Sequence, residues 1–277
     1  MTPNFYSLSK SLRHHENLTA SDDGGGGNDP DFADVQFLTT FDTNLPTDLS
    51  NNSTSVSSSS YAMETSNTMF SSAGAFEGTG QSGSGSTSIA NYYLKVDSST
   101  NFVSPTTNPR TVECFFYAEN IPSTTTWPNI WSNYSHGGNV GTYLSLTNPG
   151  YSQTLYLTLR GTSTIDLYAT TDLISADIWY YVMVAFSGTS VDSPQVSIYC
   201  AEATESTAPQ VANQSYSYSI PDGSVAAIGA NYASSRPSHG FFSGWDGHID
   251  ELRVSTVDLS SDHASTVPVP QNTFPTS

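Results

Sequence analysis

The stretch that decides the fold of this chain is FFSGWDGHIDELRVS, residues 241–255. Apolar side chains stand at Ile249, Leu252 and Val254, with charged side chains between and beside them. Two glycines come before this run, and glycine tolerates positive φ and lets neighbouring backbones approach closely. The stretch therefore predicts a bend that leads into the closing strand of a β-sheet.

Short strand-like runs separated by turn-forming residues follow one another from residue 35 onward. The clearest is Thr111–Tyr117, in which Val112, Cys114 and Phe116 share one face by the period of two. We expect further strands over 35–41, 75–80, 89–96, 129–134, 142–146, 154–159, 164–169, 179–186, 195–201, 215–220, 225–231 and 247–255. So many short strands in succession predict an all-β fold of two packed sheets.

Composition narrows the classes of function. The chain of 277 residues has 25 acidic and 7 basic side chains and a formal net charge of −18, so direct binding to nucleic acid is not expected. Membrane insertion is not expected either, because no run is long and apolar enough.

The 13 Phe, 16 Tyr and 4 Trp supply the buried apolar area that the scarce Leu and Ile residues do not. Cys114 and Cys200 are expected as small buried side chains, and a bridge between them is not required.

The chain divides into three parts by composition. Residues 1–34 form an arm with a glycine run at 24–27, and this arm is either a disordered terminus or an assembly anchor that orders against a neighbouring subunit. The candidate contacts of such an anchor are Phe5, Tyr6, Leu8, Leu12 and Arg13. Residues 35–257 form the sandwich. Residues 258–277 form a proline-containing tail, expected to lie on the surface or to be free.

Several segments resemble, in order, the pattern of laminin-G-like, concanavalin-A-like jelly rolls. RTVECFF at 110–116 resembles the strand f-T-I-E-a-W-v, and DIWYYVMVA at 177–185 resembles g-x-W-h-H-V-A-v-t. The stretch at 241–255 resembles the ending F-x-G-x-I-D-E-x-R-I-S. The chain departs from the pattern at 200–202, where Cys-Ala-Glu replaces the usual turn. The resemblance implies an antiparallel jelly-roll sandwich of this class.

Two further segments resemble parts of tailed-phage structural proteins. Residues 29–42 are similar to their opening D-P-x-F-x-x-V-x-L-L-L-H-F-D-G, and residues 267–275 are similar to their close F-T-P-P-x-x-P-F-P. This resemblance implies a virion structural protein: a capsid decoration, a head fibre or a tail component. Its partners would be other virion proteins and further copies of itself. It would be made in the host cytoplasm without a signal peptide, since residues 1–19 lack an apolar core.

Catalytic motifs are not found in the sequence. Endoglucanases that share the fold carry Glu-x-Asp-x-x-Glu on one strand, because glycoside hydrolysis needs two carboxylates around the scissile bond. Asp250 and Glu251 are adjacent, so we expect them on opposite faces of a strand, where they cannot flank one bond. No Gly-x-Ser-x-Gly elbow and no zinc-type Cys/His spacing occurs. We therefore expect that the protein is not an enzyme.

The alternative to a purely structural role is a carbohydrate-binding host adhesin, because sugar rings stack on exposed aromatic side chains. Trp131 and Trp179 are assigned to the core, while Trp127 and Trp245 stay open between core and surface. The candidate glycan-binding residues are Trp127, Asn129, Tyr134, His136, Tyr232 and Trp245.

No cofactor is required by the sequence, and Ca²⁺ is the one ion that the resemblance admits. Laminin-G-like domains hold it with a loop Asp and backbone carbonyls, and Ca²⁺ needs several oxygen ligands. Asp166 and Asp246 are the candidate ligands, with a solvated carboxylate as the alternative for each.

Overall fold

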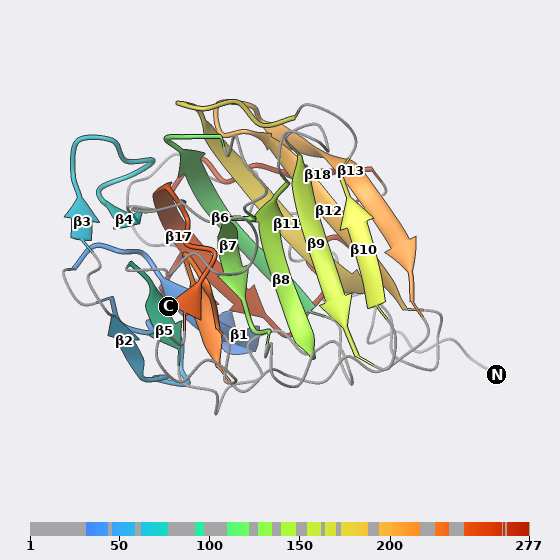
Figure 1. Ribbon diagram of the computed structural model, residues 1–277, viewed down its shortest axis with the longest axis horizontal. Helices are drawn as coiled ribbons and strands as arrows, with labels where there is room; N and C mark the ends of the chain where they lie inside the picture. The colour runs from blue at the N-terminus through green and yellow to red at the C-terminus, as the bar shows by residue number, and fades with distance from the viewer. Residues whose placement is uncertain are drawn as a thin grey trace.

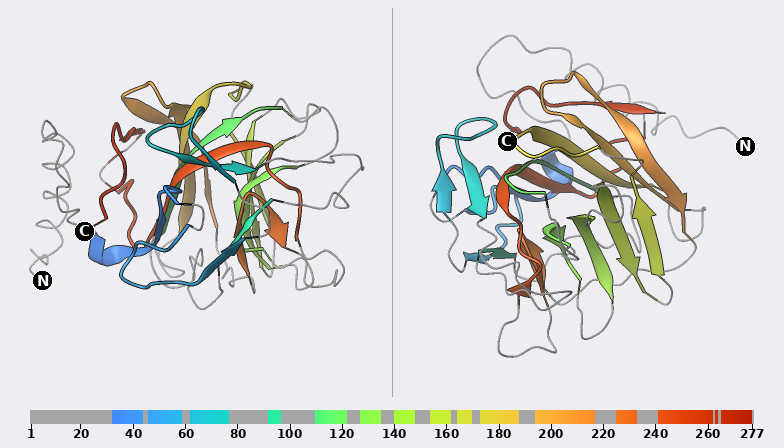
Figure 2. Two further views of the ribbon diagram at one scale, coloured as in Figure 1. Left: turned by 90° about the vertical axis from the view of Figure 1, so that its left-hand side faces the viewer. Right: turned by 45° about the horizontal axis from the view of Figure 1, so that its top comes forward.

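The computed structural model describes residues 32–43, 46–58, 62–76, 92–96, 110–121, 127–134, 140–147, 154–161, 164–169, 173–187, 194–216, 225–232, 241–261, 263 and 265–276. These residues form two antiparallel sheets that pack face to face (Figures 1 and 2). The fold is therefore the all-β jelly-roll sandwich that the sequence predicts. No helix in this part of the chain is long and apolar enough to cross a membrane.

Sheet A has nine strands and is built around β6 and β17. Its order is β18 (Thr266–Pro268), β13 (Thr207–Ser215), β12 (Gln195–Glu202), β11 (Trp179–Ser187), β6 (Arg110–Ala118), β17 (Gly247–Ser255), β4 (Ala73–Phe76) and β3 (Ala62–Glu64). The ninth strand, β1 (Val35–Thr39), follows a 3-10 turn, η1 (Phe32–Asp34), and pairs with β17.

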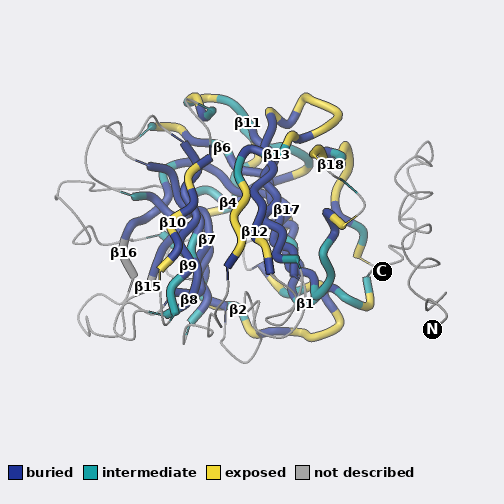
Figure 3. Tube along the Cα trace, turned by 90° about the vertical axis from the view of Figure 1, so that its right-hand side faces the viewer, coloured by how far each residue is buried: buried dark blue, intermediate teal, exposed yellow. Residues whose placement is uncertain are grey.

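Sheet B has seven strands. Its order is β10 (Thr164–Tyr168), β9 (Leu155–Arg160), β8 (Gly141–Leu146), β7 (Asn129–Ser132), β14 (Ala226–Ile228), β5 (Leu94–Val96) and β2 (Val56–Ser58). A separate ribbon pairs β15 (Asn231–Tyr232) with β16 (Phe241–Phe242). In Figure 3 the buried residues follow the strands of both sheets, and many exposed stretches lie in the connections.

The main core lies between the two sheets. Val112, Cys114 and Phe116 of β6 point into it, as the period of two predicts, and Trp131 of β7 is fully buried there. Cys114 and Cys200 are both buried and unbridged. They lie opposite the same residue of β11 from its two sides, which puts them two strand spacings apart, about 9.5 Å, too far for a disulfide.

A second core covers the outer face of sheet A. It contains Phe115 and Tyr181 from the sheet together with Val267, Val269 and Phe274 from the C-terminal segment. Of the two alternatives expected for this segment, the free tail was therefore wrong, because the segment lies along the outer face of sheet A with buried apolar side chains. The prolines of this segment end regular strand pairing, but the apolar side chains between them are buried against sheet A. Strand β18, which belongs to the same segment, adds one strand to the edge of sheet A.

Two details of the strand assignment also differ. The structure has a strand at Thr207–Ser215 that the sequence did not predict, because Pro209 and mostly polar or small residues hide the alternation, and most of the strand expected at 215–220 lies outside the described residues. In β17 the pairing with β6 shifts between Asp250 and Arg253, and Glu251 adopts a φ of 50°. This β-bulge breaks the alternation that the sequence suggests.

Candidate functional site

The outer face of sheet B carries a cluster of aromatic side chains. On each of β8, β9 and β10, one tyrosine stands next to a leucine, and the leucines point into the main core. The tyrosines therefore point outward. The register brings Tyr156 beside Tyr168, and Tyr143 is one row away. We call this cluster the ring face, and its members are Trp127, Tyr134, Tyr143, Tyr156 and Tyr168.

The rings of this face form one contact network. Tyr156 is at its centre, with its ring centroid 4.6 Å from Trp127, 4.7 Å from Tyr168 and 5.9 Å from Tyr143. Tyr134 extends the network from Tyr143 at 5.3 Å. The surrounding rings cover Tyr156, which is only 4% exposed, whereas Tyr168 is 38% exposed. The accessible surface is therefore made mainly of ring faces and edges.

One carboxylate and one guanidinium group are built into the ring face. Asp166 accepts hydrogen bonds from the Tyr156 hydroxyl at 2.6 Å and from the Thr158 hydroxyl at 3.0 Å. Arg160 donates from Nη1 to the Thr164 hydroxyl at 3.0 Å. Its Nε atom is buried and has no hydrogen-bond partner among the described residues. The face thus has an acceptor and a donor held at fixed positions between rings.

The ionisation states of this face follow from its burial. Burial raises the pKa of Tyr156, and the nearby Tyr143 and the hydrogen bond to Asp166 raise it further. Burial also raises the pKa of Tyr134. Burial disfavours the charged form of Arg160, but Tyr143 and Asp166 outweigh it, so its pKa is raised. At neutral pH these two tyrosines are neutral hydroxyls and Arg160 is a cation.

Such an arrangement is chemically suited to a polyhydroxylated ligand. Aromatic rings stack against the apolar C–H faces of sugars, while hydroxyl, carboxylate and guanidinium groups exchange hydrogen bonds with sugar hydroxyls. The described part of the chain holds no group of three His, Cys, Asp or Glu side chains fit for a metal ion. The face thus offers ring surfaces and hydrogen-bonding groups suited to binding such a ligand.

The structure brings together four of the candidates named from sequence. Trp127, Tyr134 and Asp166 belong to the ring face or contact it. Asn129 is 1% exposed and donates from Nδ2 to the Trp127 carbonyl at 2.8 Å, so it positions Trp127 rather than meeting a ligand. Tyr143, Tyr156 and Tyr168 were not among the candidates. The position of each tyrosine next to a leucine in its strand was the signal that could have found them.

Other candidates lie elsewhere. Trp245 is 1% exposed and packs edge-on against Phe116 at 5.7 Å in the main core, so its proposed contact with a sugar was wrong. Asp246 accepts from the Asn120 amide at 2.9 Å near sheet A, far in the topology from Asp166. Trp179, expected in the core, is half-buried on the outer face of sheet A.

Several candidates fall outside the described residues. These are His136, the side chain of Tyr232, and the arm residues Phe5, Tyr6, Leu8, Leu12 and Arg13. The backbone of Tyr232 is described, and it pairs with Phe241 in the β15–β16 ribbon.

The adjacent acids of β17 have a structural role. The bulge brings both carboxyl groups to the segments that cover sheet A, so the expectation of opposite faces was wrong. Asp250 accepts from the Phe70 backbone N–H at 3.3 Å, and Glu251 accepts from the Phe274 backbone N–H at 2.8 Å. Both residues are at most 1% exposed. Their carboxyl groups therefore bind backbone N–H groups of the covering segments.

Comparisons with known proteins support the fold. No family model and no curated protein matches the sequence. The binding domain of Paraclostridial Mosquitocidal Protein 1 is similar with a TM-score of 0.58 and 13% identity, over 82% of this chain and 50% of that one. The binding domain of botulinum neurotoxin serotype D/C VPI 5993 gives 0.56 and 12%, over 83% and 50%.

A third similar structure concerns botulinum neurotoxin type C, whose cell entry is described as dependent upon interaction with two ganglioside molecules. Its TM-score is 0.53 with 11% identity, over 83% of this chain and 49% of that one. This chain thus spans about half the length of the neighbours. At such low identity the likeness establishes the jelly-roll fold alone, and the first two neighbours are binding domains.

Proposed function

We propose that this protein is a non-enzymatic structural component of a tailed-phage particle, and that its jelly roll binds a cell-surface glycan through the ring face. The ring face carries the proposal: Trp127, Tyr143 and Tyr168 are partly accessible rings grouped around Asp166 and Arg160. Repetition of the domain on a virion would turn weak contacts with one sugar each into strong attachment. Ca²⁺ binding stays a prediction.

The placement of the two phage-like segments supports the display role. Phe32, from the opening segment, and Phe274, from the closing segment, both pack into the second core on the outer face of sheet A. The backbone N–H of Thr256 also donates to the Asp34 carbonyl at 2.9 Å. The ring face lies on the opposite side of the sandwich. A particle attached on the sheet A side, through other virion proteins or further copies of this chain, would leave the ring face pointing outward.

The glycan half of the proposal is tested by the Tyr168→Ala variant on a glycan array. Tyr168 and Leu49 are the exposed large apolar residues of the described part, at 38% and 37%, so Leu49→Ala is a matched control. We expect Tyr168→Ala to lose most array binding with an unchanged unfolding curve, because an aromatic contact contributes about 0.5–1.5 kcal/mol beyond the area that it buries. Equal binding by both variants, or no binding by the unmodified protein, would contradict it.

The virion half is tested by removing residues 1–28 and measuring incorporation into particles. We expect the truncated protein to fold, because the described strands begin at residue 35, and to be missing from purified virions. Normal incorporation would rule out the anchoring role of the arm while leaving glycan binding untouched, so the two halves fail separately.

A further inference from the structure

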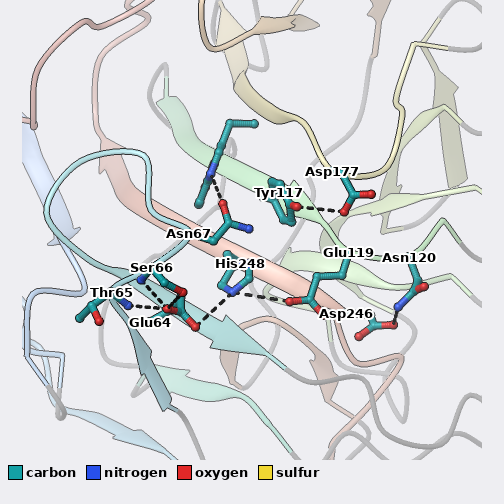
Figure 4. A network of polar contacts seen from close by, with 11 residues as sticks. Glu64, Thr65, Ser66, Asn67, Tyr117, Glu119, Asn120, Asp177, Asp246 and His248 are labelled. Atoms are coloured by element: carbon teal, nitrogen blue, oxygen red, sulfur yellow. Dashed lines mark hydrogen bonds and ion pairs between the residues drawn. The ribbon is translucent and has the colours of Figure 1, made fainter.

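A second group of polar and aromatic side chains lies on the outer face of sheet A, away from the ring face (Figure 4). Cross-strand pairing places His248 of β17 beside Tyr117 of β6, and Tyr117 beside Trp179 of β11. Their ring centroids are 5.4 and 5.6 Å apart. Carboxylates surround this row. We call the group the acid–ring cluster, and it consists of Tyr117, Trp179, His248, Glu64, Glu119 and Asp177.

The rings of this cluster are held in place. Trp179 donates from Nε1 to Asn67 Oδ1 at 3.1 Å, and the Tyr117 hydroxyl donates to Asp177 Oδ1 at 2.9 Å. Gly247 has a φ of 145°, and a Cβ there would stand 2.0 Å from the Tyr117 carbonyl oxygen. Only glycine lets β17 run this close to β6 immediately before His248.

The carboxylates of the cluster have no basic partner. No lysine or arginine of the described residues pairs with Glu64, Glu119 or Asp177. Glu64 is fixed by hydrogen bonds from the Thr65 and Ser66 backbone N–H groups and the Ser66 hydroxyl. These bonds lower its pKa to about 2, so Glu64 stays ionised. The cluster therefore holds uncompensated negative charge beside aromatic rings.

His248 is the observation that points to a ligand. It is 4% exposed, and its Nδ1 atom is buried with no hydrogen-bond partner among the described residues. Its Nε2 atom faces the gap between Glu119 Oε1 at 3.7 Å and Glu64 Oε2 at 4.0 Å, both beyond hydrogen-bonding distance. A ligand N–H group placed in that gap would give Nε2 and the two carboxylates the hydrogen-bond partner that the described residues do not supply.

The chemistry of this gap selects a cation with N–H donors. Two carboxylate oxygens meet there, one each from Glu64 and Glu119, and Nε2 of His248 is a third acceptor in the tautomer that carries its proton on Nδ1. A primary ammonium has three N–H bonds to donate to these three atoms. The neighbouring rings favour a cation as well. The cluster does not qualify as a metal site in the described part of the chain. We propose that the acid–ring cluster binds the primary ammonium group of an amino sugar or of a lysine side chain.

The charge state of His248 makes the binding dependent on pH. Burial lowers the pKa of His248, against the opposing pull of Glu119 and Glu64. The other groups that face the row are Tyr117, whose pKa burial raises, and Asp177. At neutral pH the imidazole is neutral and accepts a hydrogen bond. As the pH falls through the pKa of His248, the imidazole becomes a cation. Its positive charge then takes the place of the ligand's ammonium charge beside the two carboxylates, so the affinity for the ligand decreases.

The first test compares small amines by ligand-observed NMR with the full chain at pH 7.5. We expect glucosamine or Nα-acetyl-lysine amide to bind, N-acetylglucosamine to be silent, and choline to bind several-fold more weakly because it has no N–H. The amine that binds more tightly identifies the source of the ammonium. Equal binding of choline or N-acetylglucosamine, or no binding of either primary amine at millimolar concentration, would overturn the proposal.

The second test separates the cluster from general attraction to an acidic protein. Glu119→Gln removes one carboxylate of the gap, and Glu205→Gln removes an exposed one elsewhere. We expect Glu119→Gln to weaken binding by about two- to fivefold, the value of one exposed ion pair, and Glu205→Gln to leave it unchanged. Equal losses would overturn the site.

The third test follows Nα-acetyl-lysine amide from pH 7.5 to pH 5, a range in which its amine stays charged. Affinity of the unmodified protein should fall, and His248→Gln should remove that fall. An affinity that does not change with pH in the unmodified protein would overturn the role of His248.

Discussion

Among the described residues, segments from elsewhere in the chain cover the outer face of sheet A, whereas the outer face of sheet B carries the aromatic side chains of the ring face. On sheet A, the segments around Phe70 and Phe274 pack over Phe115 and Tyr181. Ionisable groups lie beneath these covering segments: Asp250 and Glu251 accept hydrogen bonds from their backbone, and Glu113 pairs with Arg253. On sheet B the polar groups sit among partly accessible rings.

The difference shows how similar residue types can serve stability in one layer and binding in another. A buried carboxylate must be fully partnered, since an unpaired one costs several kcal/mol. The carboxyl groups under the cover of sheet A meet backbone N–H groups or Arg253, and this fixes the C-terminal segment. Asp166 on sheet B is exposed, so it is free of that requirement and can organise hydroxyl groups.

The largest effect that tests this comparison is expected from breaking the ion pair between Arg253 and Glu113, which lies under the segments that cover sheet A. Arg253 approaches Glu113 Oε1 at 2.7 Å from Nη2, and its guanidinium lies 4.5 Å from the Phe274 ring centre. Arg253→Met leaves Glu113, 1% exposed at its side chain, without its cation. We expect a loss of about 3–5 kcal/mol in the free energy of unfolding by urea denaturation.

The control is the double variant Arg253→Met with Glu113→Gln, which removes the stranded charge and should recover part of the loss. If Arg253→Met alone costs less than about 1 kcal/mol, the pair is not a buried one and the comparison fails.

A smaller effect is expected from pH. Burial raises the pKa of Asp250 from 3.8 to about 7 and that of Glu251 from 4.5 to about 8. The folded state therefore keeps protons that the unfolded state has released. This stabilisation is complete below the unfolded pKa values and is lost as pH rises through 7 and 8. We expect the free energy of unfolding to fall by on the order of 2 kcal/mol between pH 7 and pH 9.

Thermal unfolding across that range measures the effect. Asp250→Asn keeps an acceptor for the Phe70 N–H but does not titrate, so it should flatten the decline. Stability that rises from pH 7 to pH 9 would show that these carboxyl groups are ionised in the fold and that the cover is held differently.

The same comparison explains how much could be predicted from the sequence. The strands of the main core, such as β6 and β11, were predicted because their apolar residues alternate and only one face of each enters that core. The segments that cover sheet A were not predicted. Asp250 and Glu251 fit an ordinary alternating strand pattern, and the β-bulge that changes the direction of their side chains depends on partners distant in sequence. Proline in the C-terminal segment likewise suggested a free tail, although Val267 and Phe274 bury there.

The ring face was predicted only in pieces. Trp127, Tyr134 and Asp166 were named separately, as an aromatic loop and as an isolated acid. What joins them is Tyr156, and its position between Trp127 and Tyr168 depends on the register of β8, β9 and β10. Register is set by long-range pairing and turn geometry, which the residues of one strand do not reveal. The prediction that Trp245 contacts a sugar was wrong for a related reason, because the burial of its side chain depends on which segments pack over it.

The smallest effect sharpens the account of the ring face itself. Tyr156→Phe keeps the central ring but removes the hydroxyl that Asp166 accepts, and we expect a loss of about 1 kcal/mol in unfolding free energy. Thr158→Val removes the other hydroxyl donor to Asp166 at a similar cost. Because both hydroxyls serve one carboxylate, the double variant should cost measurably less or more than the sum. Strict additivity would mean that Asp166 does not couple the two hydroxyl groups, and the ring face would then be a set of independent side chains rather than one organised surface.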